Sequence, residues 1–126
     1  MQIRIYYEDT DIGGIVYHTN YIKYCERARS EIFFEAGMMP GEGSERGFMV
    51  TELQAKFLKS ATLGDMLEVK TYTEKIKNVS VALRQEIYRG EEKIFTLTLL
   101  LVYGDKGRIS KIPPEVCTLF EKLPIA

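Results

Sequence analysis

The sequence is poor in the side chains that bind metals and form disulfides. It has a single histidine, His18, and only two cysteines, Cys25 and Cys117, which form no CxxC pair. These residues cannot supply a zinc site of three or four ligands within one chain, and two thiols make no disulfide framework. We therefore expect reduced thiols, no metal or other cofactor, and a cytoplasmic protein.

Long apolar runs and an excess of one charge are also missing. No stretch reaches the roughly 18 apolar residues of a membrane span, and the opening MQIRIYYE indicates a strand and not a signal peptide. Lys and Arg number 17 against 18 Asp and Glu, so no broad positive field attracts nucleic acid. With 126 residues, 45% hydrophobic and 28% charged, the chain fits a single domain over residues 1–126.

One long amphipathic helix is predicted near the N-terminus. Its apolar stripe recurs at spacings of three and four residues, through Tyr21, Cys25, Ala28, Ile32 and Ala36. Asn20 fits an N-cap and Gly37 fits a C-terminal stop. A second, short helix is predicted to begin at Pro114, because proline is favoured in a first helical turn.

Most of the remaining chain alternates with the two-residue period of strands. The predicted strands are 2–8, 52–57, 67–72, 79–87 and 94–103. Residues 88–93, YRGEEK, form a hairpin turn, and the Gly- and Pro-rich stretch 38–47 indicates a loop. Because 94–103 is apolar on both faces, we expect it at the centre of the sheet, covered by the helix and by a partner subunit. The order predicts an α+β fold with the last four strands in meander and one sheet wrapped around one helix.

Several kinds of active site do not fit this sequence. It has no GxSxG elbow, and no glycine run precedes the Lys-Ser or Lys-Thr of a phosphate loop. Cys25 lies about 10 Å along the helix from His18, too far for a catalytic pair, and its place on the apolar stripe predicts a core residue. Asp9 and Asp11 begin like an EF-hand loop, but Asn20 stands where that loop needs a bidentate Glu.

What remains is a carboxylate close to a helix N-terminus, in the segment DTDIGGIVYHTNYIKY, residues 9–24. Unpaired N–H groups there favour a developing oxyanion while the carboxylate attacks a carbonyl or activates water, an arrangement that suits acyl transfer. Simpler interpretations stay open. Asp-Thr-Asp before two glycines is commonly a turn, His18 can be a half-exposed capping residue, and Lys75 and Lys77 can be the solvated end of a strand.

The same segment resembles the signature of a known family, the hotdog-fold acyl-CoA thioesterases. The narrower resemblance is to the YbgC type, associated with the Tol-Pal cell-envelope system, within the 4-hydroxybenzoyl-CoA thioesterase family. The matching residues are Tyr7–Asp11 (YEDTD), Gly14, Val16–His18, Asn20-Tyr21 and Cys25–Arg29 (CERAR). Residues 57–65 (FLKSATLGD) and Ile112-Pro113 resemble further family landmarks, so the likeness covers essentially the whole chain.

This resemblance implies a hotdog fold, with an antiparallel five-stranded sheet wrapped around one long central helix. It also implies a homodimer or tetramer in which subunits join their sheets, with the active site at the interface. The implied reaction is hydrolysis of a short-chain or aromatic acyl-CoA to the free acid and CoA. The alternatives are a hotdog dehydratase and a non-catalytic module that binds acyl-CoA or acyl carrier protein.

Residue by residue, the resemblance implies that Asp11 is the nucleophile or general base. The backbone N–H of His18 is expected to polarise the thioester carbonyl, and its imidazole to assist. Other branches of the family place the carboxylate on the long helix, where Glu31 or Glu35 would serve, and Ser60 replaces a frequent proline. The residues expected to shape the turn or to contact the substrate, including the nucleotide phosphates, are Tyr7, Asp9, Gly14, Tyr17, Asn20, Lys75 and Lys77.

Overall fold

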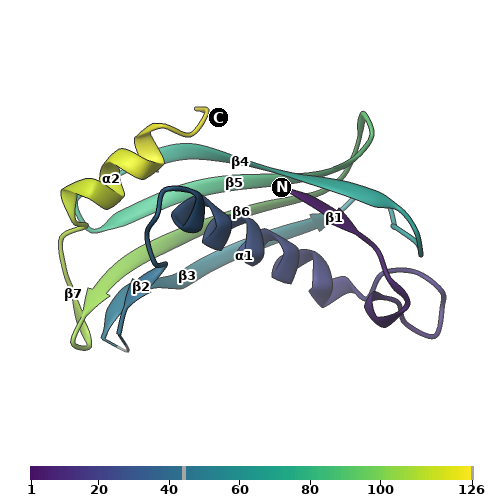
Figure 1. Cartoon of the computed structure of the whole chain (residues 1–126), viewed down its shortest axis with the longest axis horizontal. Helices are drawn as coiled ribbons and strands as arrows, with labels where there is room; N and C mark the ends of the chain where they lie inside the picture. Colours follow the sequence, from purple (N-terminus) through teal and green to yellow (C-terminus); the bar gives the residue numbers. More distant parts are fainter. Residues whose placement is uncertain (44, 126) are drawn as a thin grey trace.

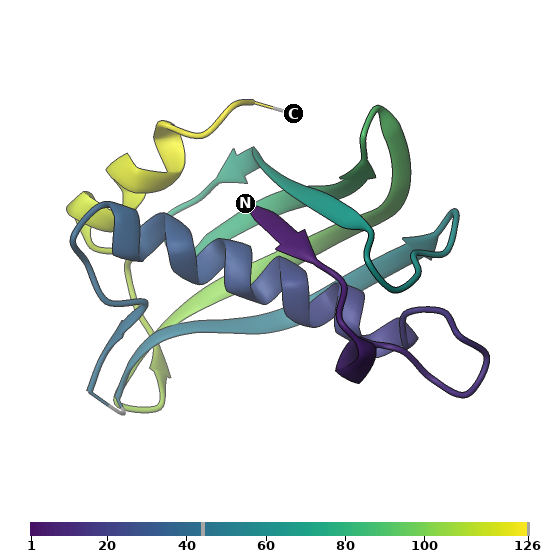
Figure 2. The ribbon, with the colours of Figure 1, turned by 45° about the vertical axis from the view of Figure 1, so that its right-hand side comes forward.

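A curved antiparallel sheet wraps around one long helix in the computed structural model, which describes residues 1–43 and 45–125 (Figure 1, Figure 2). This confirms the predicted α+β architecture. The five predicted strands correspond to β1, β3, β4, β5 and β6, and β2 and β7 are short additions. From one edge to the other the order is β1 (Gln2–Arg4), β4 (Met66–Ile76), β5 (Ser80–Arg89), β6 (Glu92–Asp105), β3 (Arg46–Phe57) and β2 (Gly41–Glu42), with β7 (Arg108–Ile109) paired to β6.

The predicted meander of four strands is wrong for one of them. β4, β5 and β6 follow one another as antiparallel neighbours, but β3 pairs with β6 and not with β4. β3 therefore lies at the opposite side of the sheet from β1, and β6 is central, as its apolar residues predicted. Alternation in a sequence fixes which face a strand buries, but it does not identify the strand's neighbour.

The helix α1 (His18–Glu35) crosses the concave face of the sheet (Figure 2). Tyr21, Cys25 and Ala28 are buried, as the apolar stripe predicted. Towards the C-terminal end the buried residue is Phe33, while Ala36 is exposed. The short helix α2 (Pro114–Glu121) begins where predicted and contacts the C-terminal part of α1, with the Phe120 and Phe33 rings 5.9 Å apart.

The predicted N-cap of α1 is wrong by three residues. The N-cap is Tyr17, and no side chain caps the helix there. Asn20 is not available as a cap because its Nδ2 donates a hydrogen bond to the Asp9 carbonyl at 2.9 Å. At the other end, Gly37 follows the last turn with a φ of +72°, so the predicted stop is confirmed.

Two shorter segments also differ from the prediction. The N-terminal strand ends at Arg4 and not at Glu8, and Tyr7–Asp9 form a 3-10 turn, η1. The chain turns there because the Asp9 carboxylate accepts the backbone N–H of Tyr6 at 2.8 Å. Within 38–47, predicted as a loop, β2 pairs with the start of β3.

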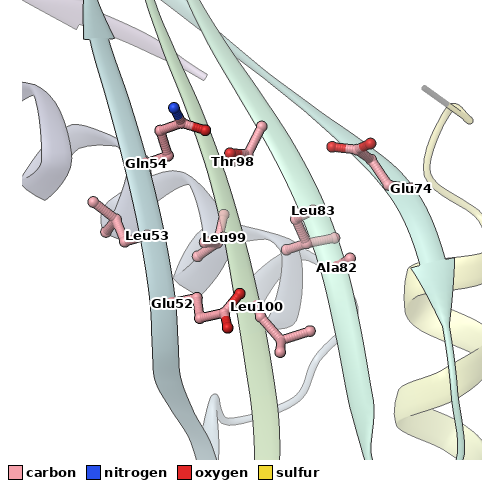
Figure 3. Close-up of a pocket in the computed structure, with 9 residues that line it drawn as sticks. All are labelled: Glu52, Leu53, Gln54, Glu74, Ala82, Leu83, Thr98, Leu99 and Leu100. Carbon is pink, nitrogen blue, oxygen red and sulfur yellow. The ribbon is translucent and has the colours of Figure 1, made fainter.

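The two faces of the sheet are covered very differently. On the concave face, Leu97, Leu99 and Leu101 of β6 are buried. On the convex face, Thr98 and Leu100 are half-buried and line a groove of about 350 Å³. Figure 3 looks onto this groove, with α1 behind the sheet. The groove is therefore on the opposite face from the helix.

The outer edge of β3 is unpaired over most of its length. In the part of the chain that the structure describes, β2 covers only Arg46 and Gly47. The rest of the edge carries exposed apolar side chains, among them Met49, Val50, Leu53 and Phe57. An unpaired apolar edge strand is a ready surface for another chain.

Candidate active site

Residues 9–18 form a tight loop directly ahead of α1. Thr10 and Val16 make an antiparallel bridge, and the Asp11 N–H donates to the Ile15 carbonyl at 2.9 Å. Gly14 closes the turn by donating to the Asp11 carbonyl at 3.0 Å, with a φ of +80° that favours glycine. The structure thus places Gly14, which was expected to contact the substrate, at the closure of the turn.

Asp11 lies exposed on this loop. Its Oδ1 accepts the Gly13 N–H at 2.8 Å, and the described residues provide no hydrogen bond to Oδ2. The simple Asx-type turn that the sequence left open is therefore present. It fixes one carboxylate oxygen and leaves the other available to a substrate or a water.

The first turn of α1 supplies unpaired backbone N–H groups. The helix begins at His18, has no side-chain cap and carries no acidic residue in its first turn. The N–H groups of His18 and Thr19 therefore have no intrahelical acceptor, and no negative side chain offsets the positive end of the helix dipole. The His18 imidazole is exposed and lies edge-on to Phe57, with ring centroids 6.1 Å apart.

Asp9 and Asn20 hold the entry to the helix. The Asp9 carbonyl accepts the Tyr17 N–H at 3.0 Å and the Asn20 side-chain amide at 2.9 Å. With its carboxylate on Tyr6, Asp9 is committed to the fold. Of the two aspartates, Asp9 is half-buried and Asp11 is exposed, so the Asp11 carboxylate is the more accessible to a substrate.

Apolar side chains stand out from the same region. Tyr7 is 82% exposed and Ile12 is fully exposed, while Tyr17 is 47% exposed and its ring lies 4.8 Å from that of His18. Exposed apolar groups around a functional loop mark a surface that binds a ligand or a partner.

Lys75 and Lys77 lie at the other end of the sheet. The loop docks on Ala61 through the Val16 N–H, close to the start of β4, whereas Lys75 is near the end of that strand. At 3.3 Å per residue, Lys75 is roughly 30 Å from Asp65, which precedes β4. Within one chain the structure does not bring these lysines to Asp11.

The carboxylates of α1 are also remote from the helix N-terminus. Glu31 lies about 20 Å along the axis from His18, and Glu35 is one turn further. Both are exposed. Within one chain, Asp11 is therefore better placed than either of them to act beside the N–H groups.

Cys25 is a core residue, as predicted. Its side chain is fully buried, and burial raises the pKa of its thiol to about 12. A thiol in this state is not a nucleophile at neutral pH.

The sequence reasoning missed a cavity of about 210 Å³ between α1 and β3. Arg29 contributes to its wall and is held by Gln85, whose Oε1 accepts the Arg29 Nη1 at 2.9 Å. One signal was available in the sequence. Gln85 occupies an inward position of the alternating strand 79–87, where an apolar residue is the rule.

Two further observations concern cofactors and membranes. Residues 1–43 and 45–125 contain no group of three or more His, Cys, Asp or Glu side chains that could hold a metal ion. In that same part of the chain, neither helix has the length and apolar character needed to cross a membrane.

Comparison with known proteins identifies the family of this chain. Residues 13–96, more than half of the chain, match the family described as the Thioesterase superfamily. The chain belongs to this superfamily. Its likeness to a solved structure, a probable thioesterase from Bartonella henselae, extends over 90% of this chain and 97% of that one, with a TM-score of 0.83 and 28% identity. The expected hotdog fold is thereby confirmed.

Among named relatives, the chain is similar to proteins of the YbgC type. It is 50% identical over 88 residues to the "Acyl-CoA thioesterase YbgC" of Helicobacter pylori, a match that covers 70% of this chain and 65% of that protein. It is 31% identical over 128 residues to the "Acyl-CoA thioesterase YbgC" of Haemophilus influenzae, covering 96% and 93% of the two chains.

Proposed function

We propose that this protein is an acyl-CoA thioesterase that hydrolyses short-chain or aromatic acyl-CoA to the free acid and CoA. The observation that carries the proposal is the loop of residues 9–18, in which Asp11 keeps one free carboxylate oxygen and the uncapped N-terminus of α1 follows directly. Membership of the thioesterase superfamily and the names of the relatives support the same reaction.

In the proposed mechanism the thioester oxygen accepts the His18 N–H while the carbonyl carbon is attacked. Such an oxyanion donor lowers the activation barrier by about 3 kcal/mol. If Asp11 attacks, the C–S bond breaks, CoA leaves as a thiolate, and water then hydrolyses the mixed anhydride. If Asp11 is a general base, it takes a proton from water, the resulting hydroxide adds to the carbonyl, and the proton passes to the departing sulfur.

One outcome of a single turnover in H₂¹⁸O with excess enzyme would identify attack by Asp11. Attack by Asp11 puts an unlabelled carboxylate oxygen into the first acid released, provided that water attacks the aspartyl carbonyl of the anhydride. General-base catalysis, or water attack on the acyl carbonyl, puts ¹⁸O into the acid at once. In these two cases, Asp11 gains no ¹⁸O.

We propose that a second copy of the chain completes the site through the edge of β3. A two-fold axis that makes the sheets continuous pairs the two β3 strands antiparallel. His18 lies at the Phe57 end of β3, and Phe48 is at the other end. The dimer therefore places the helix N-terminus of one subunit near Phe48 of the partner subunit, and it encloses a loop that a single chain leaves open.

The dimer also offers Lys75 and Lys77 a role. These lysines lie at the same end of the sheet as Phe48. Lys75 pairs with Ala82 of β5. Two residues away, Ser80 pairs with Val102 of β6, and Val102 pairs in turn with Met49, the neighbour of Phe48. A CoA phosphate would thus meet the lysines of the partner subunit. The acyl group could also be carried by an acyl carrier protein, which is the second carrier to test. The two free thiols fit our expectation of a cytoplasmic protein.

The experiment is a panel of aliphatic and aromatic acyl-CoAs assayed for free thiol release, with the wild type and Asp11→Asn. We expect Asp11→Asn to lose at least about 1,000-fold in kcat. Glu31→Gln is the matched control, and it should stay near the wild type. Full activity of Asp11→Asn would overturn the assignment of Asp11. Binding without thiol release would favour a binding module, and hydration of an enoyl thioester would favour a dehydratase.

A further inference from the structure

The cavity beside α1 combines apolar walls with two charged side chains of the helix, Glu26 and Arg29. Phe33, Phe48, Val50 and Phe120 form much of its surface, and Arg29 enters it from the helix. Its volume of about 210 Å³ suits a small organic group. It lies on the concave side, between α1 and the strand whose edge is free.

Arg29 makes no salt bridge in the part of the chain that the structure describes, although the negative charge of Glu26, exposed one turn earlier on α1, acts to raise its pKa. The guanidinium is half-buried, and its one hydrogen bond there goes to the neutral Gln85. Burial lowers the pKa of Arg29 from its ordinary value, which reflects the cost of this position. A charge taken out of water is normally held in a direct ion pair, so the lack of such a pair at Arg29 is the informative feature.

Gln85 fixes the direction of the guanidinium. It is fully buried, and its Nε2 donates to the Cys25 carbonyl at 2.9 Å and to Thr71 Oγ1 at 3.1 Å. The amide nitrogen is thus committed to acceptors, and Oε1 must face Arg29. One N–H of Arg29 is used in this way, which leaves the others for a ligand.

The cavity is linked to the site of the chemistry by the geometry of the dimer. In one chain, Arg29 lies about 16 Å along α1 from His18, beyond the reach of a short acyl group. In the antiparallel β3 dimer, the Phe48 end of the partner subunit, which borders its cavity, lies near the helix N-terminus of the first. A thioester held at His18 therefore points its acyl group into the opposite subunit.

We propose that this cavity is the acyl pocket and that Arg29 selects acyl groups ending in a carboxylate. The inference rests on the proposed function and on the β3 dimer. A terminal carboxylate can accept two parallel N–H bonds from a guanidinium and supplies the direct ion pair that Glu26 does not make. The apolar walls contact the methylene groups between the carboxylate and the thioester. The substrate class is thus a monothioester of a short dicarboxylic acid.

The test compares substrates of matched length. Adipoyl-CoA is assayed against hexanoyl-CoA and glutaryl-CoA against valeryl-CoA, and kcat/KM is measured for each with the assembled wild-type protein. We expect a preference of about 10- to 100-fold for the carboxylated member of at least one pair, the size of a charge-assisted hydrogen bond. No preference in either pair would overturn the inference.

Three variants and one control variant locate the preference. Arg29→Gln should bring the ratio of the paired substrates close to one, and Arg29→Lys should restore part of it. Gln85→Glu places a carboxylate against Arg29 and should also remove the preference, because the guanidinium then has an internal partner. Arg27→Gln makes the same change as Arg29→Gln on an exposed part of α1 and should keep the wild-type ratio. An unchanged ratio in Arg29→Gln would overturn the inference.

A binding measurement separates this inference from the proposed function. Adipoyl-CoA and hexanoyl-CoA are titrated into Asp11→Asn and into Asp11→Asn/Arg29→Gln by calorimetry, with melting curves to show that both fold. Tighter binding of adipoyl-CoA that depends on Arg29 supports the pocket even if the wild type releases no thiol. Thiol release from every substrate with no effect of Arg29 on either ratio or binding keeps the thioesterase and overturns the pocket.

Discussion

The two halves of α1 position functional groups by different means. At the N-terminal end, the groups that we propose for catalysis are backbone N–H groups and one exposed carboxylate, held by the hydrogen bonds of a short loop. In the C-terminal half, Arg29 is a side chain fixed by a fully buried amide that links the helix to β5 and β4. Substitutions at the first end should therefore change the rate, and substitutions at the second should change stability and selectivity.

The largest expected effect, a loss of catalytic rate without a loss of stability, comes from His18→Pro at the N-terminal end of α1. Proline is favoured at the first helical position, and the extended Tyr17 backbone before it, with ψ of 131°, is compatible with it. The variant should fold normally, yet it removes the N–H. We expect kcat to fall about 100- to 1,000-fold. His18→Ala keeps the N–H, and a similar loss there would assign the effect to the imidazole.

The next largest effect is on stability, from Gln85→Leu. The substitution leaves the Thr71 hydroxyl and one Arg29 N–H without their partner inside the protein. We expect the free energy of unfolding to fall by about 2 kcal/mol, measured by urea denaturation. Gln54→Leu, on the exposed strand β3, is the control and should change it little. Equal effects of the two would show that the buried network adds nothing specific.

A smaller effect is expected from Asn20→Ala at the N-terminal end. The side-chain amide holds the Asp9 carbonyl, which also accepts the Tyr17 N–H. Its loss should cost about 1 kcal/mol and loosen the loop locally. Hydrogen exchange at the Tyr17 amide should become faster, while the amides of central β6 keep their protection. Unchanged exchange at Tyr17 would contradict this role of Asn20.

The smallest effect concerns Asp65, which supports the segment on which the loop docks. The Thr62 backbone N–H, followed by Arg89, lowers the pKa of Asp65. Because the folded pKa is depressed, this stabilisation is present above the unfolded value of about 4 and is lost as pH falls through the folded pKa. Asp65→Asn should cost less than about 1 kcal/mol at pH 7. Melting curves of the two proteins should converge in acid, and a constant difference would contradict the linkage.

The parts of this molecule that were predictable depend on local pattern. The stripe through Tyr21, Cys25 and Ala28 identified the buried face of α1. The resemblance of the 9–18 segment to a family indicated Asp11 as the catalytic residue, and that role stays a prediction. The position of β3 was not predictable, because its neighbour β6 is brought to it by the fold and not by sequence proximity. The helix start was misjudged because Asn20, a good capping residue, is used instead to hold Asp9.

The distance between Asp11 and the predicted phosphate-binding lysines is also set by the fold and not by sequence proximity. Lys75 and Lys77 suited phosphate binding by charge, but a strand of 11 residues carries them away from the loop. Arg29 lay within a recognised motif without an assigned role. The role that we propose for it depends on its hydrogen bond to Gln85, 56 residues later, and no local pattern joins the two.

The bare edge of β3 also has a kinetic consequence. If turnover requires two copies of the chain, the specific activity falls upon dilution below the concentration at which they associate, and it recovers with a lag set by their encounter rate. The amount of protein in a cell would then regulate the reaction more steeply than in proportion.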